Sequence, residues 1–180
     1  TKQFITLPPV TVGPETTISF WFRWYDQSEW SKILFLSDDN ADENEITIAQ
    51  HGASKQLYIR ANSLIYSGSP ISYEMNATEY LDDTWYHLTL ELSISTGCRF
   101  YRDGVYIPNT NNNDPIEFAN LFPDGYYTYV KNAIGGNPHY TGAHRWKGYI
   151  DDVRIYNRLL TIELKANSQK GYQSLVVLPF

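Results

Sequence analysis

The sequence predicts an all-β fold, in which two antiparallel sheets pack face to face as a β-sandwich and one short helix lies near the C-terminus. Most segments with regular hydrophobic spacing are short, rich in β-branched or aromatic residues, and bounded by Gly, Pro, Asn, Asp or Ser. Apolar and polar side chains alternate along the longest of them, which is typical of strands with one buried face. The 180 residues contain no long polar or low-complexity interruption, so we expect one domain over residues 1–180.

Strand-like segments follow one another along almost the whole chain. The expected strands are Gln3–Leu7, Thr17–Tyr25, Lys32–Leu36, Glu45–Gln50, Gln56–Ala61, Leu64–Tyr66, Trp85–Ser93, Arg99–Arg102, Val105–Ile107, Tyr126–Val130, Lys147–Tyr156 and Leu175–Leu178. Asp103-Gly104 predicts a two-residue hairpin turn, because these residues supply the positive φ angles that such a turn requires. Ser95-Thr96-Gly97 predicts the turn of the hairpin before it.

The C-terminal part of the chain carries the expected helix and one further strand. The helix is expected to begin at Thr161, whose hydroxyl can accept hydrogen bonds from the first free backbone amides, and to run for about two turns. The last strand, Leu175–Leu178, is expected to pair with the N-terminal segment Phe4–Leu7.

Two adjacent carboxylates interrupt the apolar strand Lys147–Tyr156. Regular alternation would place Asp151, Val153 and Ile155 on one face of this strand, and Asp152 with its alternate neighbours on the other. Asp151 is therefore expected to point toward the interior. A buried carboxylate is costly unless it is bound, so this side chain should accept hydrogen bonds or hold a cation.

The composition excludes some classes of partner. The net charge is −6, the estimated pI is 5.1, and no basic run is present, which argues against nucleic acid as a partner. No apolar stretch approaches the roughly 20 residues that a membrane span requires. Cys98 is the single cysteine, so no internal disulfide is possible. The chain does not begin with Met, and we expect it to be a piece of a longer protein; Asn76-Ala77-Thr78 is an N-glycosylation sequon.

Five segments, in this order, resemble the laminin-G-like domains of the concanavalin A-like lectin and glucanase superfamily, to which the pentraxins are related. They are Thr17-Ile18-Ser19-Phe20-Trp21-Phe22, Thr84-Trp85-Tyr86-His87-Leu88, Phe100-Tyr101-Arg102-Asp103-Gly104, Ile134-Gly135-Gly136, and the run from Trp146 to Arg158. The resemblance implies a jelly roll of two curved antiparallel sheets. The motif after Arg158 is one residue shorter than the family pattern, which leaves the register of the expected helix open.

The resemblance also implies a calcium ion, because hydrolases of this fold often place an Asp beside a structural calcium at the position matched by Asp151. The alternative is that Asp151 accepts hydrogen bonds from backbone amides. A second candidate for calcium is the acidic segment Ser37–Glu45, in which Asp38 and Asp39 are the first carboxylates. A solvated acidic loop is the alternative there, and the spacing does not match an EF-hand.

Aromatic residues suggest two surfaces for glycan binding. The chain has 15 Tyr and 5 Trp, more Tyr than a core alone needs, and sugar sites combine flat aromatic rings with polar side chains. Trp21, Arg23 and Tyr25, together with Ser19, should share the face of one strand that is opposite its apolar side chains, where they could line a concave sheet surface. The second candidate surface consists of Tyr126, Tyr127 and Tyr129. For Trp21 a packing role is the alternative, because the matching position in the family is usually a packing residue.

The carboxylate pattern of a hydrolase is missing from the sequence. Laminarinase-type enzymes carry Glu-x-Asp-x(-x)-Glu on one strand, and no segment fits that pattern. We therefore expect a non-catalytic recognition module of a larger extracellular or cell-surface protein, which binds a glycan or a protein partner. A structural domain that assembles with neighbouring chains in an extracellular filament or adhesive is the alternative, and a glycoside hydrolase is a third.

Overall fold

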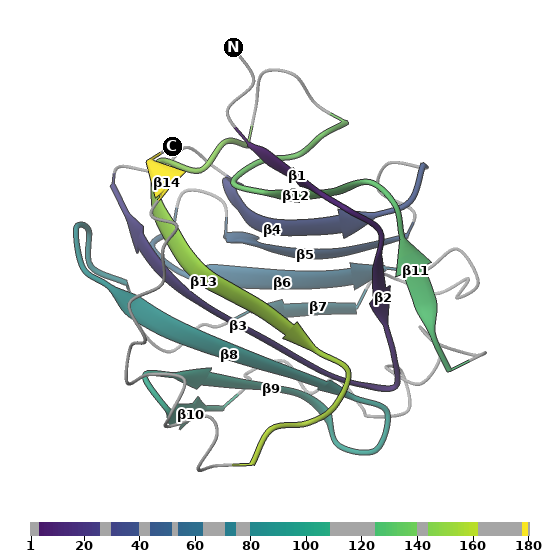
Figure 1. The fold of residues 1–180 in the computed structure, drawn as a ribbon. Coiled ribbons are helices and arrows are strands. Elements are labelled where there is room, and N and C mark those ends of the chain that lie inside the picture. The colour runs from purple at the N-terminus through teal and green to yellow at the C-terminus, as the bar shows by residue number, and fades with distance from the viewer. Residues whose placement is uncertain are drawn as a thin grey trace.

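A computed structural model describes residues 4–25, 30–39, 44–51, 54–62, 71–74, 80–108, 125–139, 144–161 and 178–179. This part of the chain is all-β and contains no helix, as Figure 1 shows. It therefore has no helix with the length and apolar character needed to cross a membrane. The expected helix after Thr161, the expected strand Leu64–Tyr66 and the sequon at Asn76 lie outside the described residues.

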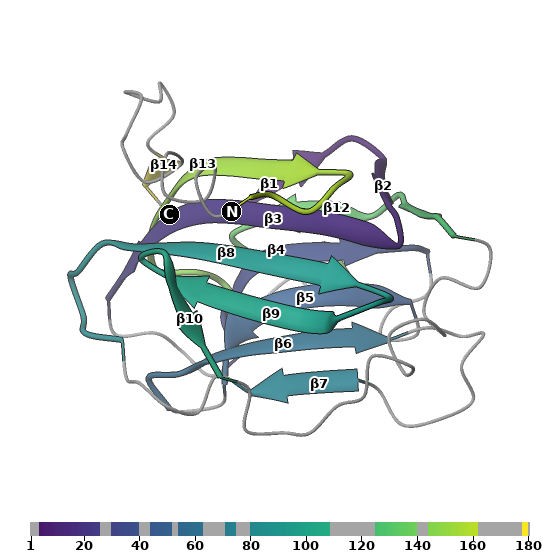
Figure 2. The same cartoon turned by 90° about the horizontal axis from the view of Figure 1, so that it is seen from below.

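Two six-stranded antiparallel sheets form the two layers of the sandwich, which confirms the predicted fold class (Figures 1 and 2). The first sheet has the order β1 (Ile5–Leu7), β12 (Asn132–Ile134), β4 (Lys32–Ser37), β5 (Glu45–Gln50), β6 (Leu57–Asn62) and β7 (Ile71–Glu74). The second sheet has the order β10 (Val105–Ile107), β9 (Gly97–Arg102), β8 (Tyr86–Ser93), β3 (Glu15–Trp24), β13 (Gly148–Tyr156) and β14 (Leu178–Pro179). A small two-stranded sheet joins β2 (Val10–Val12) to β11 (Tyr127–Tyr129).

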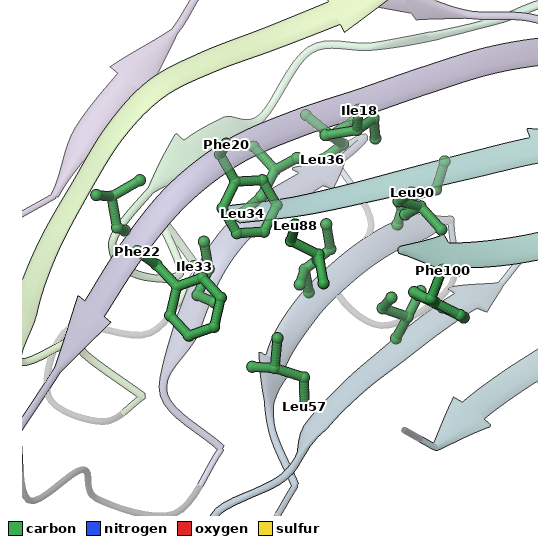
Figure 3. Packing of buried hydrophobic residues seen from close by; sticks show 14 of the residues in the cluster. Ile18, Phe20, Phe22, Ile33, Leu34, Leu36, Leu57, Leu88, Leu90 and Phe100 are labelled. Atoms are coloured by element: carbon green, nitrogen blue, oxygen red, sulfur yellow. The ribbon is translucent and has the colours of Figure 1, made fainter. Parts of the chain in front are cut away.

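The core lies between the two sheets, because each strand turns one set of alternating side chains inward. Strand β3 contributes Ile18, Phe20, Phe22 and Trp24, all of which are almost completely buried. They meet Leu34 and Leu36 of β4 and Leu88 and Leu90 of β8, among others (Figure 3). The opposite set of side chains on β3 is thereby left on the outer face of the second sheet.

Both predicted hairpin turns are confirmed. Asp103 and Gly104 have φ angles of 51° and 76° and join β9 to β10, with Val105 paired to Arg102. Gly97 has a φ angle of 74° and closes the hairpin between β8 and β9, in which Ser93 pairs with Gly97. The positive φ angles are those that a tight turn between right-handed twisted strands requires.

The expected inward direction of Asp151 is wrong. Ile150 lies opposite Phe22 and Asp151 opposite Trp21, but the next paired residue is Arg154, opposite Ser19. The intervening residues form a β-bulge, in which Asp152 has a φ angle of 50°. The bulge adds one residue to the alternation, so Asp151 lies on the outer face, whereas Ile155 beyond the bulge still packs against the core.

The expected pairing of the C-terminal strand is also wrong. Within the described residues, β14 pairs with β13, where Pro179 lies opposite Tyr149 and Leu178 opposite Ile150. The N-terminal strand β1 pairs with β12 in the other sheet. Strand β14 is thus an edge strand, a place where proline is tolerated because it has no N–H to donate.

Candidate functional site

The outer face of the second sheet brings together aromatic and charged side chains from three segments. In the ladder between β3 and β13, Arg23 lies opposite Tyr149. Tyr25 follows β3 directly, and its backbone N–H donates to the carbonyl oxygen of Lys147 at 3.0 Å. Asp83 and Trp85 belong to the segment before β8. We call Arg23, Tyr25, Asp83, Trp85 and Tyr149 the Arg23 cluster.

Tyr149 is the central aromatic ring of the Arg23 cluster. Its centroid lies 5.8 Å from that of Tyr25 and 6.1 Å from that of Trp85. The guanidinium carbon of Arg23 is 5.2 Å from the Tyr149 centroid and 5.6 Å from the Tyr25 centroid, so both rings attract the cation. A hydrogen bond with Tyr149 raises the pKa of Tyr25, so the Tyr25 phenol is neutral at physiological pH.

Asp83 fixes the orientation of the Arg23 guanidinium. Nε and Nη2 of Arg23 lie 2.8 Å and 2.6 Å from Oδ1 of Asp83, and Nη2 lies 3.5 Å from the hydroxyl of Tyr25. Partial desolvation lowers the pKa of Arg23, but Asp83 and Tyr25 together raise it by more, so the net pKa of Arg23 is raised and the guanidinium is charged. Within the described part of the chain, Nη1 of Arg23 and Oδ2 of Asp83 have no hydrogen-bond partner.

The backbone around the Arg23 cluster is unusual at two points. Asp83 has a φ angle of 58°, and its N–H donates to the carbonyl oxygen of Trp24 at 2.9 Å. Gly148 has a φ angle of 148° and lies so close to β3 that a Cβ atom would come within 2.0 Å of the Arg23 carbonyl oxygen. Left-handed non-glycine residues cost about 1–3 kcal/mol and occur preferentially at functional sites. The surrounding structure therefore holds Asp83 in a conformation that presents its carboxylate to Arg23.

The structure places the predicted residues Arg23 and Tyr25 in this cluster. Trp21 lies on the same face of β3, two residues before Arg23 and opposite Asp151. The half-buried Trp21 ring packs against His87, with 5.1 Å between the centroids. Sequence reasoning missed Asp83, Trp85 and Tyr149 as site residues. They come from segments that are distant in the sequence. Only the register of β13 and β8 on β3 brings them next to Arg23, and composition and alternation do not determine that register.

His87 lies beneath the outer face and is buried. Its Nε2 is 3.2 Å from the hydroxyl of Ser19, and its backbone N–H donates to Asp103 at 2.9 Å. Burial lowers the pKa of His87, and the carboxylates of Asp103 and Asp152 offset only part of that effect. The folded domain therefore favours the neutral imidazole.

We expect His87 to make the domain less stable at acidic pH. Because the folded pKa lies below the unfolded value of about 6.5, stability is complete above that pH and falls as the pH drops through it. In urea unfolding experiments at several pH values, the free energy of unfolding of wild type should fall more between pH 7.5 and 5 than that of His87→Gln. Parallel profiles for the two proteins would contradict this assignment.

The second predicted surface is divided between core and solvent. Tyr129 is 3% exposed and belongs to the core, whereas Tyr126 is 60% exposed and lies over Gly13. The half-buried Tyr127 donates a hydrogen bond of 2.9 Å to Oδ2 of Asp38, which also accepts one of 2.6 Å from Nδ2 of Asn44. Burial, with Asp38 as the second cause, raises the pKa of Tyr127 to about 12. Tyr126 alone of the three exposes most of its ring.

Among the described residues, no group of three or more His, Cys, Asp or Glu side chains is positioned to hold a metal ion. Asp38 already accepts hydrogen bonds, and Asp39 lies 3.4 Å from the ammonium group of Lys131. Asp151 accepts a hydrogen bond of 2.7 Å from the backbone N–H of Asp152. Calcium binding by Asp151, Asp38 and Asp39 stays a prediction.

Three similar solved structures, each 10–18% identical to this chain, share the fold. Domain 4 of the arabinanase AbnA from Geobacillus stearothermophilus, in complex with arabinotriose, is 18% identical with a TM-score of 0.65, covering 92% of this chain and 72% of that one. The CBM40 domain of a Ruminococcus gnavus sialidase, bound to α2,3 sialyllactose, is 10% identical with a TM-score of 0.63, and the match covers 93% of this chain and 97% of that one. A pentraxin from Limulus polyphemus is 15% identical with a TM-score of 0.58, covering 91% and 72%.

The sequence itself matches a family model. No curated protein sequence matches the chain. The laminin-G family model described as "Concanavalin A-like lectin/glucanases superfamily" matches residues 1–163, which is most of the chain. The resemblance inferred from the five sequence segments is thereby confirmed. The chain belongs to the laminin-G-like family of the concanavalin A-like lectin and glucanase superfamily.

Proposed function

We propose that this domain is a non-catalytic carbohydrate-binding module and that the Arg23 cluster holds the sugar. The observation that carries the proposal is the combination of accessible aromatic rings with a fixed ion pair. Trp85 is 36% exposed, Tyr149 is half-buried, and both border the pair of Arg23 and Asp83. The rings offer a surface for the apolar C–H face of a sugar, and the ion pair offers donors and acceptors for its hydroxyl groups.

The similar structures support this class of ligand. Two of them are carbohydrate complexes, one with the neutral arabinotriose and one with the acidic sialyllactose. At 10–18% identity they share the fold with this chain, and the ligand must be argued from this chain's own side chains. The missing Glu-x-Asp-x(-x)-Glu pattern supports a binding role rather than hydrolysis.

Sugar binding should depend on the two bordering rings. The wild-type domain is expected to bind at least one oligosaccharide on a glycan array that includes arabinotriose and sialyllactose. Trp85→Ala and Tyr149→Ala should each weaken this binding about tenfold or more. Loss of one aromatic ring that stacks on the sugar removes about 1–2 kcal/mol of binding free energy, by analogy with other aromatic pairs. Calorimetric titration of the best oligosaccharide measures the change.

Tyr106→Ala is the matched control for these variants. Tyr106 is 49% exposed on the edge strand β10 of the same sheet, and its aromatic neighbour is Tyr101. Its removal should leave sugar binding unchanged. If the array shows no oligosaccharide bound, or if the Tyr106 variant loses as much binding as the Trp85 variant, the proposed site is wrong.

We also place this module in a larger extracellular or cell-surface protein, in line with the family. A protein partner, or assembly with neighbouring chains, is the alternative, and exposed apolar side chains favour it. Val105 is 69% exposed at the β10 edge and Leu81 is 61% exposed. Sedimentation of the sugar-free domain as a monomer would count against assembly.

A further inference from the structure

We propose that Arg23 and Asp83 together bind two neighbouring hydroxyl groups of a sugar, and that the Arg23 cluster selects neutral sugars with such a vicinal diol over acidic sugars. This inference rests on the proposed function and specifies its ligand. It is based on the ion pair of Arg23 and Asp83. This pair uses Nε and Nη2 of Arg23 and Oδ1 of Asp83, and it leaves Nη1 and Oδ2 for hydrogen bonds with a ligand.

Hydrogen-bonding capacity remains on both members of the pair. Oδ1 of Asp83 receives both Nε and Nη2 of Arg23, and Nη2 also approaches Tyr25. Nη1 therefore keeps two N–H donors and Oδ2 keeps its acceptor positions, with no partner among the described residues. One hydroxyl can accept from Nη1 while its neighbour on the sugar ring donates to Oδ2. A carboxylate can use Nη1 but not Oδ2, because it has no proton to donate.

Both groups are accessible to a ligand. The side chain of Asp83 is 64% exposed and that of Arg23 is 29% exposed. The Arg23 guanidinium cannot turn away easily, since the rings of Tyr25 and Tyr149 and the Asp83 carboxylate all hold it. A donor and an acceptor held in fixed positions lose little entropy on binding, which favours a specific hydroxyl geometry.

The charges around the cluster do not favour an anion. The charge of Arg23 is cancelled by that of Asp83. Asp151 lies on the same face two residues beyond Tyr149, and Lys147 lies two residues before it, so these charges also cancel. An acidic sugar would thus meet the accessible carboxylate of Asp83 without a net positive field, in a chain whose net charge is −6.

The left-handed backbone of Asp83 also fits this role. A non-glycine residue with a φ angle of 58° persists because its surroundings impose it, here through the hydrogen bond to Trp24. Asn and Asp are the residues that tolerate this conformation best. Asp83→Asn therefore keeps the backbone while removing the charge and one acceptor, so it tests the ligand contact without unfolding the segment.

The test measures the affinity of wild type and of several variants for a matched pair of trisaccharides. Galactotriose and trigalacturonate differ by the carboxylates at C6, and neutral trioses of glucose, mannose, xylose and arabinose extend the series. Wild type should bind at least one neutral triose and bind trigalacturonate at least tenfold more weakly than galactotriose. Asp83→Asn and Arg23→Lys should each weaken the bound neutral triose tenfold or more, because lysine lacks the planar fork of donors.

Asp82→Asn is the control for charge alone. Asp82 is the adjacent residue, with a side chain that is 47% exposed and 2.7 Å from Lys55, away from Arg23. Its replacement should change affinity less than twofold. Tighter binding of trigalacturonate than of galactotriose, or neutral binding that Asp83→Asn leaves intact while Trp85→Ala abolishes it, would overturn the diol proposal but not the sugar site. Absence of binding to every triose would overturn both.

Discussion

Replacing Gly148 with alanine is expected to destabilise the domain by about 3 kcal/mol or more. A Cβ at this position would lie 2.0 Å from the carbonyl oxygen of Arg23 and 2.8 Å from Cα of Trp24, both backbone atoms of β3. Strands β3 and β13 would have to separate, and a φ angle of 148° is one that L-residues rarely adopt. The same separation would move Arg23 away from Tyr149, so sugar affinity should fall together with stability.

Gly125→Ala separates the steric effect from the backbone effect. Gly125 also has a positive φ angle, 84°, but apart from its chain neighbours no residue that the structure describes lies within 4 Å of its Cβ position. This variant should lose only about 1 kcal/mol, the cost of a left-handed backbone. Urea unfolding followed by tryptophan fluorescence measures the free energy of unfolding of both variants. Equal destabilisation of the two variants would mean that the close approach of β13 to β3 is not the cause.

Phe22→Ala is expected to cost about 3–5 kcal/mol, a large part of the stability of a domain of this size. Phe22 is completely buried and lies at the centre of an aromatic group. Its ring centroid is 5.3–6.0 Å from those of Phe20, Trp24, Tyr80, Tyr86 and Trp146. Alanine would leave a cavity that these large rings, held by the second sheet and by the segments before β8 and β13, cannot fill.

Two companion variants make the Phe22 result interpretable. Phe22→Leu fills part of the cavity and should cost clearly less than alanine. Leu81→Ala removes a side chain that is 61% exposed and should change stability by no more than about 0.5 kcal/mol. If Phe22→Ala were as mild as Leu81→Ala, the aromatic group around Phe22 would not be the centre of the core.

Local patterns predicted most of the long strands and both hairpin turns. Glu45–Gln50 and Val105–Ile107 have the bounds that alternation and turn residues indicate. The strand at Asn132–Ile134 was missed, because no hairpin turn joins it to the strands with which it pairs, whereas the equally short strand Val105–Ile107 follows the Asp103-Gly104 turn. Such short strands are defined by pairing with distant segments, here β1 and β4.

The direction of Asp151 shows where alternation fails. The core residues Ile150 and Ile155 are five positions apart, an odd spacing that a regular strand cannot place on one face. The pattern therefore contains the signal of a bulge, but it does not say between which residues the bulge lies. In the structure it falls between Asp151 and Arg154, which sends Asp151 to the side of Trp21.

The candidate site was partly predictable. Alternation along β3 placed Arg23 and Tyr25 on a face away from the core, and the structure has them there. The partners of Arg23 could not be predicted, because Tyr149 lies more than a hundred residues further along the chain and Asp83 depends on a left-handed turn. Only the three-dimensional register joins these groups.

Strand β14 covers the edge of the second sheet beside Tyr149. Pro179 lies opposite Tyr149 in the backbone pairing, about one strand spacing of 4.8 Å away, and Figure 1 shows β14 next to β13. A fluorescent dye attached to β14 would therefore lie near the Arg23 cluster and act as a proximity reporter whose emission changes when an oligosaccharide binds there. For the same reason, immobilising the domain through β14 would obstruct the ligand, and attachment through a distant surface residue is preferable.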